Sequence, residues 1–115
     1  MEKRRFPRMP MAKVLVDVSD GMGSFPGVVR DVSRFGIGIT DLPKRLDTSG
    51  KKMTIVIMGQ GGHFKMHVRP RWSVPDGLRK NVGVEIPNAP WGWTEFVMGY
   101  EPADEDDVWS SEINL

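Results

Sequence analysis

Three arginines near the start of the chain have the side-chain chemistry to bind an anionic ligand. Arg4, Arg5 and Arg8 lie within one short segment. The guanidinium group is always charged, planar and forked, so it suits phosphate oxygens and the O6/N7 edge of guanine. In an extended chain, Arg4 and Arg8 could contact separated phosphate oxygens or stack on a base. Taken alone, the segment is more typical of a solvated basic tail.

A second group of polar residues follows at positions 31–36. Asp31 and Ser33 are predicted to share one face of a strand, opposite Val32. A carboxylate can accept hydrogen bonds from N1 and N2 of guanine, and a hydroxyl can donate or accept. Gly36 permits close approach of a ligand to the backbone. The alternative is that Asp31 and Ser33 satisfy backbone groups in a β-turn, which is common for these residue types.

Short strands are the elements that must position these residues. Six segments rich in alternating apolar and polar residues are separated by turns, and they cover residues 12–18, 25–32, 35–39, 52–58, 63–72 and 80–86. In the third segment Phe35, Ile37 and Ile39 alternate with two glycines. Period-two alternation over short runs predicts an all-β barrel or sandwich. We expect one domain over residues 1–100.

The N-terminal arm and the C-terminal helix depart from the strand pattern. Residues 1–10 are predicted to form an extended arm, since Pro7 and Pro10 forbid a helix and weaken a strand. Residues 91–100 are predicted to form a short helix that caps the barrel. Its apolar face has helical spacing and consists of Trp93, Phe96, Val97 and Tyr100.

Charge is distributed unevenly along the chain, although its net value is only +1. Residues 1–13 carry five basic side chains and one acidic side chain, whereas residues 101–115 carry six acidic side chains and no basic one. We expect residues 101–115 to form a flexible acidic tail that could compete with a ligand for the basic arm. The chain has no cysteine, which excludes disulfides and thiolate chemistry and is compatible with a reducing cytoplasm.

Other signals for chemistry are weak. His63 and His67 have no third metal ligand nearby, and the glycine-rich segment 59–62 precedes a strand rather than the helix that a phosphate loop needs. No motif places a nucleophile, and no apolar run approaches the roughly 20 residues that span a bilayer. Trp72 is assigned to strand packing. We therefore expect no catalytic residue, no metal site, no cofactor and no membrane insertion.

The two polar groups together resemble the motifs of the PilZ domain, a bacterial receptor module for cyclic di-GMP. Arg4-xxx-Arg8 resembles the first motif, and Asp31-x-Ser33-xx-Gly36 resembles the second. Residues 68–72 and 81–86 look like the later strands of that family, and the resemblance covers about residues 2–87. Phe35 departs from a position where the family often has glycine, and Ile86 stands where phenylalanine is common.

The resemblance implies a six-stranded antiparallel β-barrel with an extended N-terminal arm and a short C-terminal helix. It also implies that Arg4 and Arg8 contact the phosphates and guanine of cyclic di-GMP, and that Asp31 and Ser33 contact guanine. Arg5 lies inside the first motif and is expected to add a phosphate contact.

The expected function is therefore that of a cyclic di-GMP receptor that changes its surface on binding and regulates a protein effector in a bacterial cytoplasm. Motility, exopolysaccharide and biofilm formation are typical outputs of such a receptor. The alternative is a PilZ-like adaptor that binds proteins and leaves the dinucleotide site unused. Binding of nucleic-acid polymers is not expected, because the overall charge is balanced and the tail is acidic.

Overall fold

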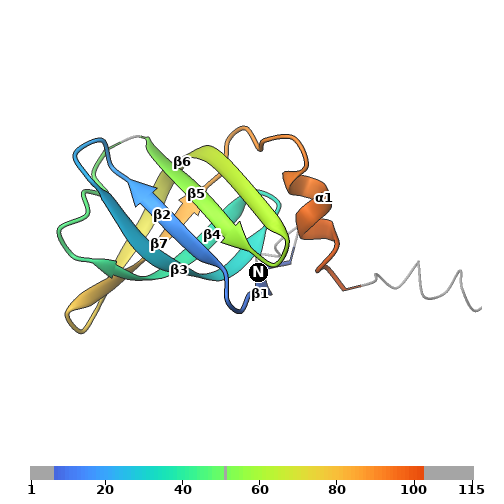
Figure 1. The fold of residues 1–115 in the computed structure, drawn as a ribbon. Helices are drawn as coiled ribbons and strands as arrows, with labels where there is room; N and C mark the ends of the chain where they lie inside the picture. Colours follow the sequence, from blue (N-terminus) through green and yellow to red (C-terminus); the bar gives the residue numbers. More distant parts are fainter. Residues whose placement is uncertain (1–6, 51, 103–115) are drawn as a thin grey trace, which may run out of the picture.

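Six antiparallel strands close into a barrel, and a seventh, very short strand pairs with the edge of one of them. The computed structural model describes residues 7–50 and 52–102 (Figure 1). Its elements are β1 (Met9–Pro10), β2 (Leu15–Ser19), β3 (Ser24–Ser33), β4 (Gly36–Pro43), β5 (Met53–Gly59), β6 (Gly62–Asp76), β7 (Arg79–Glu85) and α1 (Trp93–Met98). The strand order is β1-β3-β2-β5-β6-β7-β4, and a further β3–β4 pairing closes the barrel. The predicted all-β barrel is confirmed.

Apolar side chains at alternate strand positions fill the barrel. Val16 and Val18 of β2, with Val14 just before it, are all 1% exposed or less, as the period-two pattern indicates. Trp93 and Val97 of α1 are also fully buried, and the Trp93 ring meets Phe64 of β6 edge-on at 5.2 Å. The helix therefore covers one end of the barrel (Figure 1).

Strand β1 lies in the segment that the sequence analysis placed in the arm without a strand. Met9 pairs with Val32 and Pro10 pairs with Asp31 of β3. Strand β2 pairs with β3 only as far as Val28, and β1 with the residues that follow it occupies the edge of β3 beyond that point. The Met9 side chain is only 6% exposed, and its burial offsets the weak strand propensity of the prolines.

The sheet has three register shifts, and two of them change which side chains of β3 and β6 face outward. The β3–β4 register shifts at Arg30, and the β6–β7 register shifts at Arg71. Both Val29 and Val32 can then point into the core although they lie three residues apart. A bulge inserts one residue against its partner strand and reverses the alternation beyond it.

The strand prediction was wrong at three places. Strand β4 runs to Pro43, four residues beyond its predicted end. Strand β6 extends to Asp76, four residues beyond the predicted end, because its second half pairs with β7 in a hairpin that projects from the barrel (Figure 1). Phe35 does not continue the apolar alternation of Ile37 and Ile39. It lies in the turn before β4 and is 56% exposed, whereas both isoleucines are fully buried.

A bidentate ion pair joins the C-terminal side of α1 to the β3–β4 turn. The Arg34 guanidinium donates to both carboxylate oxygens of Glu101, at 2.8 and 2.9 Å, and the Trp93 indole N–H donates to the Arg34 carbonyl. This pairing lowers the pKa of Glu101. Glu101 was assigned to the acidic tail from sequence, but it contacts the barrel, and residues 103–115 lie outside the described residues.

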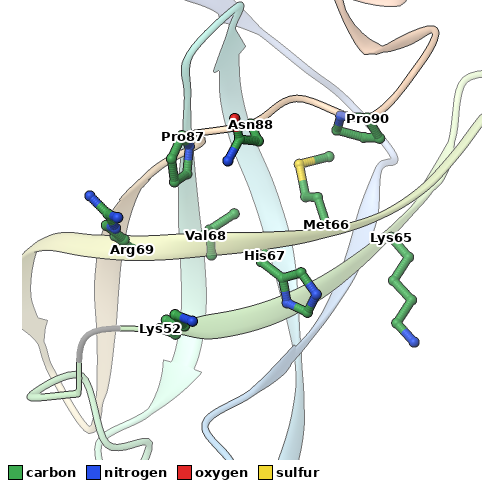
Figure 2. Close-up of a pocket in the computed structure, with 9 residues that line it drawn as sticks. All are labelled: Lys52, Lys65, Met66, His67, Val68, Arg69, Pro87, Asn88 and Pro90. Atoms are coloured by element: carbon green, nitrogen blue, oxygen red, sulfur yellow. The ribbon is translucent and has the colours of Figure 1, made fainter.

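The segment after β7 runs beside β6. Together they border a pocket of about 510 Å³, with Met66 and Val68 on β6 and Pro87, Asn88 and Pro90 on the segment (Figure 2). Within residues 7–50 and 52–102, no helix combines the length and the hydropathy needed to cross a bilayer.

At the end of the barrel that contains the β2–β3 turn, Asp20 joins two connections. Its carboxylate accepts hydrogen bonds from the backbone N–H groups of Asp47, Met22 and Gly23 at 2.8–2.9 Å, and these bonds lower its pKa below the ordinary 3.8. A carboxylate with a lowered pKa stabilises the fold above its ordinary pKa, and that contribution disappears as the pH falls through the folded-state value.

We expect Asp20→Asn to lower the melting temperature at neutral pH, because the neutral amide is a weaker acceptor for three N–H donors. The difference from the wild type should be full above about pH 5 and should shrink as the pH falls below 3.8. Melting curves over this pH range are the measurement, with the exposed Asp17→Asn as the control. A difference that persisted undiminished at the acidic end would contradict this role of the carboxylate.

Candidate ligand-binding site

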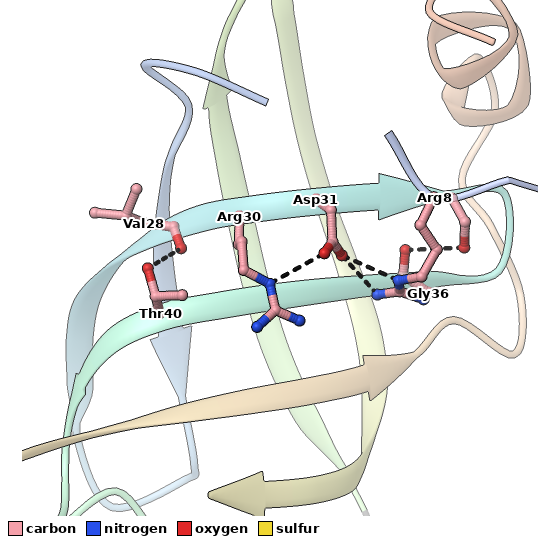
Figure 3. Close-up of polar contacts among 7 residues, drawn as sticks. Arg8, Val28, Arg30, Asp31, Gly36 and Thr40 are labelled. Carbon is pink, nitrogen blue, oxygen red and sulfur yellow. Dashed lines mark hydrogen bonds and ion pairs between the residues drawn. The ribbon is translucent and has the colours of Figure 1, made fainter. Parts of the chain in front are cut away.

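Strand β1 brings Arg8 of the arm against Asp31 of β3. Nε and Nη2 of Arg8 donate to Oδ1 of Asp31 at 3.1 and 2.8 Å (Figure 3). The two side chains are 23% and 17% exposed, so the pair is largely shielded but open to solvent on one side. The pairing of Met9 with Val32 fixes the chain next to Arg8, and this explains how residues 23 positions apart meet.

A second guanidinium group contacts the same carboxylate. Nε of Arg30 donates to Oδ2 of Asp31 at 3.0 Å (Figure 3). In a regular strand, neighbouring residues point to opposite faces, but the bulge at Arg30 places both side chains on the outer face. The cluster of Arg8, Arg30 and Asp31 therefore has a net charge of +1, which favours an anionic ligand. Arg30 was not predicted as a site residue, because nothing in the amino-acid sequence marks the position of the bulge.

Ser33 and Gly36 lie beside this cluster. The Ser33 hydroxyl donates to the Gly36 carbonyl at 3.3 Å, and Ser33 is only 7% exposed. A Cβ at position 36 would lie 3.2 Å from Nη1 of Arg8 and 3.6 Å from Oγ of Ser33. The structure thus brings four predicted residues together, although Ser33 makes the turn contact of the alternative interpretation. Arg4 and Arg5 lie outside the described residues.

Next to Asp31 two strand positions carry no side chain of their own, and neighbouring side chains cover them. Asp31 pairs with Gly38 of β4, Gly38 with Gly83 of β7, and Gly83 with Trp72 of β6, so these four residues form one row across four strands. A Cβ at Gly38 would lie 2.7 Å from Oδ1 of Asp31, and one at Gly83 would overlap the Trp72 indole. We call Gly38 and Gly83 the glycine floor, because both neighbouring side chains lie flat on it.

Trp72 forms the far side of this surface. Its indole lies over Gly83, and the Arg30 guanidinium lies 5.6 Å from the ring centroid. Trp72 is 40% exposed. The Trp72 indole packs on Gly83 of the neighbouring strand, in agreement with the assignment to strand packing, but it does so on the outer face and stays partly exposed. The bulge at Arg71 reverses the alternation, so Trp72 faces outward with the glycine floor instead of inward with Val68.

The arrangement suits a ligand that is both flat and anionic. Trp72 offers an aromatic face, Gly38 and Gly83 carry no Cβ that would project toward the ligand, Asp31 accepts hydrogen bonds, and two guanidinium groups can contact phosphate oxygens. Within the described residues, no group of three or more histidine, aspartate or glutamate side chains is placed to hold a metal ion.

Comparison with known proteins identifies the family and the fold. The sequence matches the PilZ domain family over residues 2–90, and the chain therefore belongs to this family. No curated protein sequence matches the chain closely enough to name a relative.

Solved structures with the same fold include proteins from three bacteria. The PilZ domain of YcgR from Escherichia coli, solved with c-di-GMP, is 15% identical, covers 99% of this chain and 100% of its own, and has a TM-score of 0.61. The Bacillus subtilis inhibitor of motility (MotI/DgrA) is 15% identical over 87% of this chain, with a TM-score of 0.69. Borreliella burgdorferi PlzA, solved with c-di-GMP, is 9% identical over 87% of this chain, with a TM-score of 0.63. This chain spans 49% of the MotI chain and 41% of the PlzA chain.

We expect Gly83→Ala to push the Trp72 indole off the glycine floor while the barrel stays folded, since the obstructing atoms belong to an exposed side chain. The indole N–H resonance of Trp72 should shift strongly in the ¹H–¹⁵N spectrum. Gly50→Ala is the matched control, because a Cβ there meets nothing closer than the Lys52 carbonyl at 4.0 Å. An unchanged Trp72 resonance in Gly83→Ala would show that the indole does not rest on this residue.

Proposed function

We propose that this PilZ domain binds cyclic di-GMP on the outer face of the barrel, over the glycine floor. The observation that carries the proposal is the row in which Asp31, held between two guanidinium groups, and the partly exposed Trp72 lie on the same outer face, separated by two glycines. The YcgR and PlzA structures with c-di-GMP support the choice of ligand.

Each part of the site has a role in this proposal. Guanine stacks on Trp72 or on the Arg30 guanidinium, and Asp31 accepts hydrogen bonds from N1 and N2 of the base. One of the Arg8 N–H groups that now donate to Asp31 donates instead to a phosphate oxygen of the ligand. Ser33 and Gly36 lie at the border of the bound ligand. Arg4 and Arg5 belong to the same proposal as further phosphate and guanine contacts from the arm.

The energies are sufficient for micromolar binding. A charge-assisted hydrogen bond contributes about 1.5–3 kcal/mol, and stacking of one base contributes about 1–3 kcal/mol. Micromolar affinity requires about 8 kcal/mol in total. At mid-range values, four charged contacts and one stacked base contribute about 11 kcal/mol, which leaves about 3 kcal/mol for ordering the arm and for weakening the existing Arg8–Asp31 pair.

Ligand binding can change the position of α1 through the turn between Ser33 and Gly36. Arg34 lies in this turn and holds Glu101 and Trp93, so a shift of the turn would move the helix. We propose that a protein effector recognises this changed surface. The proposed setting is a bacterial cytoplasm, since the solved relatives come from bacteria and the chain has no cysteine.

We expect calorimetric titration with cyclic di-GMP to give saturable binding in the micromolar range. Arg8→Ala and Asp31→Ala should each weaken it at least tenfold, or about 1.4 kcal/mol. Arg79→Ala is the matched control, because Arg79 also pairs with an aspartate, Asp41 at 3.2 Å, at an exposed position outside the site. Its affinity should equal that of the wild type.

Two outcomes would contradict the proposal. A wild-type protein that produced no heat at tens of micromolar would favour the adaptor function, in which the dinucleotide site is unused. Equal losses in Arg8→Ala and Arg79→Ala would indicate that only the overall charge matters. Competition by single-stranded DNA would separately point to general nucleic-acid binding.

A further inference from the structure

A row of basic side chains lies on the outer face of β6, on a different part of the surface from the glycine floor. His63, Lys65, His67 and Arg69 alternate with the inward residues Phe64, Met66 and Val68, and we call these four the cationic stripe. Lys52 lies beside the stripe, next to Arg69 in the same pocket (Figure 2). Among the ion pairs of residues 7–50 and 52–102, none involves Lys52, Lys65 or Arg69.

The pocket beside the stripe combines these cations with apolar walls. Lys52, Lys65 and Arg69 line it together with Pro87 and Pro90, and none of its lining residues is acidic. A partner that fits such a surface carries several carboxylates and at least one large apolar side chain. The C-terminal segment of this chain has that composition. Residues 103–115 contain five acidic residues and no basic one. The same segment contains the apolar residues Val108, Trp109, Ile113 and Leu115.

The described chain ends close to the start of the stripe. Phe96 of α1 packs on Gly62, the first residue of β6, so closely that a Cβ there would lie 2.7 Å from the ring. The Tyr100 hydroxyl lies 3.4 Å from the Gln60 carbonyl in the β5–β6 turn. The segment that follows Pro102 therefore starts at the end of β6 where His63 begins the stripe.

The length of the acidic run matches the stripe. An extended chain advances about 3.3 Å per residue, so residues 103–107 reach roughly 17 Å, and the stripe from His63 to Arg69 spans roughly 20 Å. Glu101 is anchored by Arg34, which fixes the point from which the segment departs. A short tether of this kind gives an effective concentration in the millimolar range, so weak contacts suffice for binding within one molecule.

We propose that residues 103–115 dock on the cationic stripe of their own barrel, with the acids at 104–107 along Lys65, His67 and Arg69. The docked segment neutralises the basic face of β6 and covers the pocket beside Pro87. This assigns the acidic segment to β6 and not to the basic arm, so the dinucleotide site and the tail use separate surfaces.

A spin label on the tail tests this directly, since the chain has no native cysteine and Ser110→Cys gives a single attachment site. In the full-length protein, the nitroxide should broaden the amide resonances of residues 63–69. Amides of β3, which lies three strands from β6 in both directions around the barrel, should be broadened least. At 1 M salt, where the Debye length is about 3 Å, the broadening should be lost.

Charge reversal of the stripe provides the matched comparison. Lys65→Glu with Arg69→Glu should abolish the broadening of β6, whereas Lys44→Glu with Arg45→Glu, on the connection after β4, should leave it unchanged. The dispersion of the same spectra reports whether each variant is folded. Absence of broadening, broadening confined to Arg8 and the β3–β4 turn, or broadening that survives the reversal of the stripe would each overturn the proposal.

Discussion

The pairing of two residues of the arm with β3 is the interaction on which the candidate site depends. Met9 is buried and lies opposite Val32, and this brings Arg8 within 2.8 Å of Asp31. Without that pairing, the arm would be a basic segment with no fixed partner, and Asp31 would keep only Arg30. A small apolar contact thus sets the electrostatics of a polar site, because a buried methionine fixes the chain on which the arginine is carried.

The rest of the site depends on two bulges and two glycines. The bulges turn Arg30 and Trp72 to the outer face, and Gly38 and Gly83 leave room for the side chains of Arg30, Asp31 and Trp72 to lie over them. Bulges often occur next to functional sites, where they redirect a side chain at little cost to the remaining ladder. The turn after Ser33 then connects this surface to α1 through Arg34, so the site and the helix are mechanically linked.

The barrel was predictable from sequence because its strands are short, alternating and separated by clear turn residues. Asp31, Ser33 and Gly36 were also found, since their spacing resembles a family motif and the structure places them together with Arg8. Arg30 and Trp72 were not found, because simple alternation assigns both to the core face and a bulge changes that assignment. The weak strand at Met9–Pro10 could not be predicted either, because its stability comes from burial against β3 and not from local propensity.

The central claim is that cyclic di-GMP lies over the glycine floor, and titration of ¹⁵N-labelled protein with this ligand tests it most directly. Glycine amides are well separated in such spectra, and Gly36, Gly38 and Gly83 report on three points of the floor and its border. The account predicts that these three amides and the Trp72 indole N–H shift together and saturate at one affinity. Shifts confined to the face that carries Asp17 and Thr54, or no shifts at all, would contradict it.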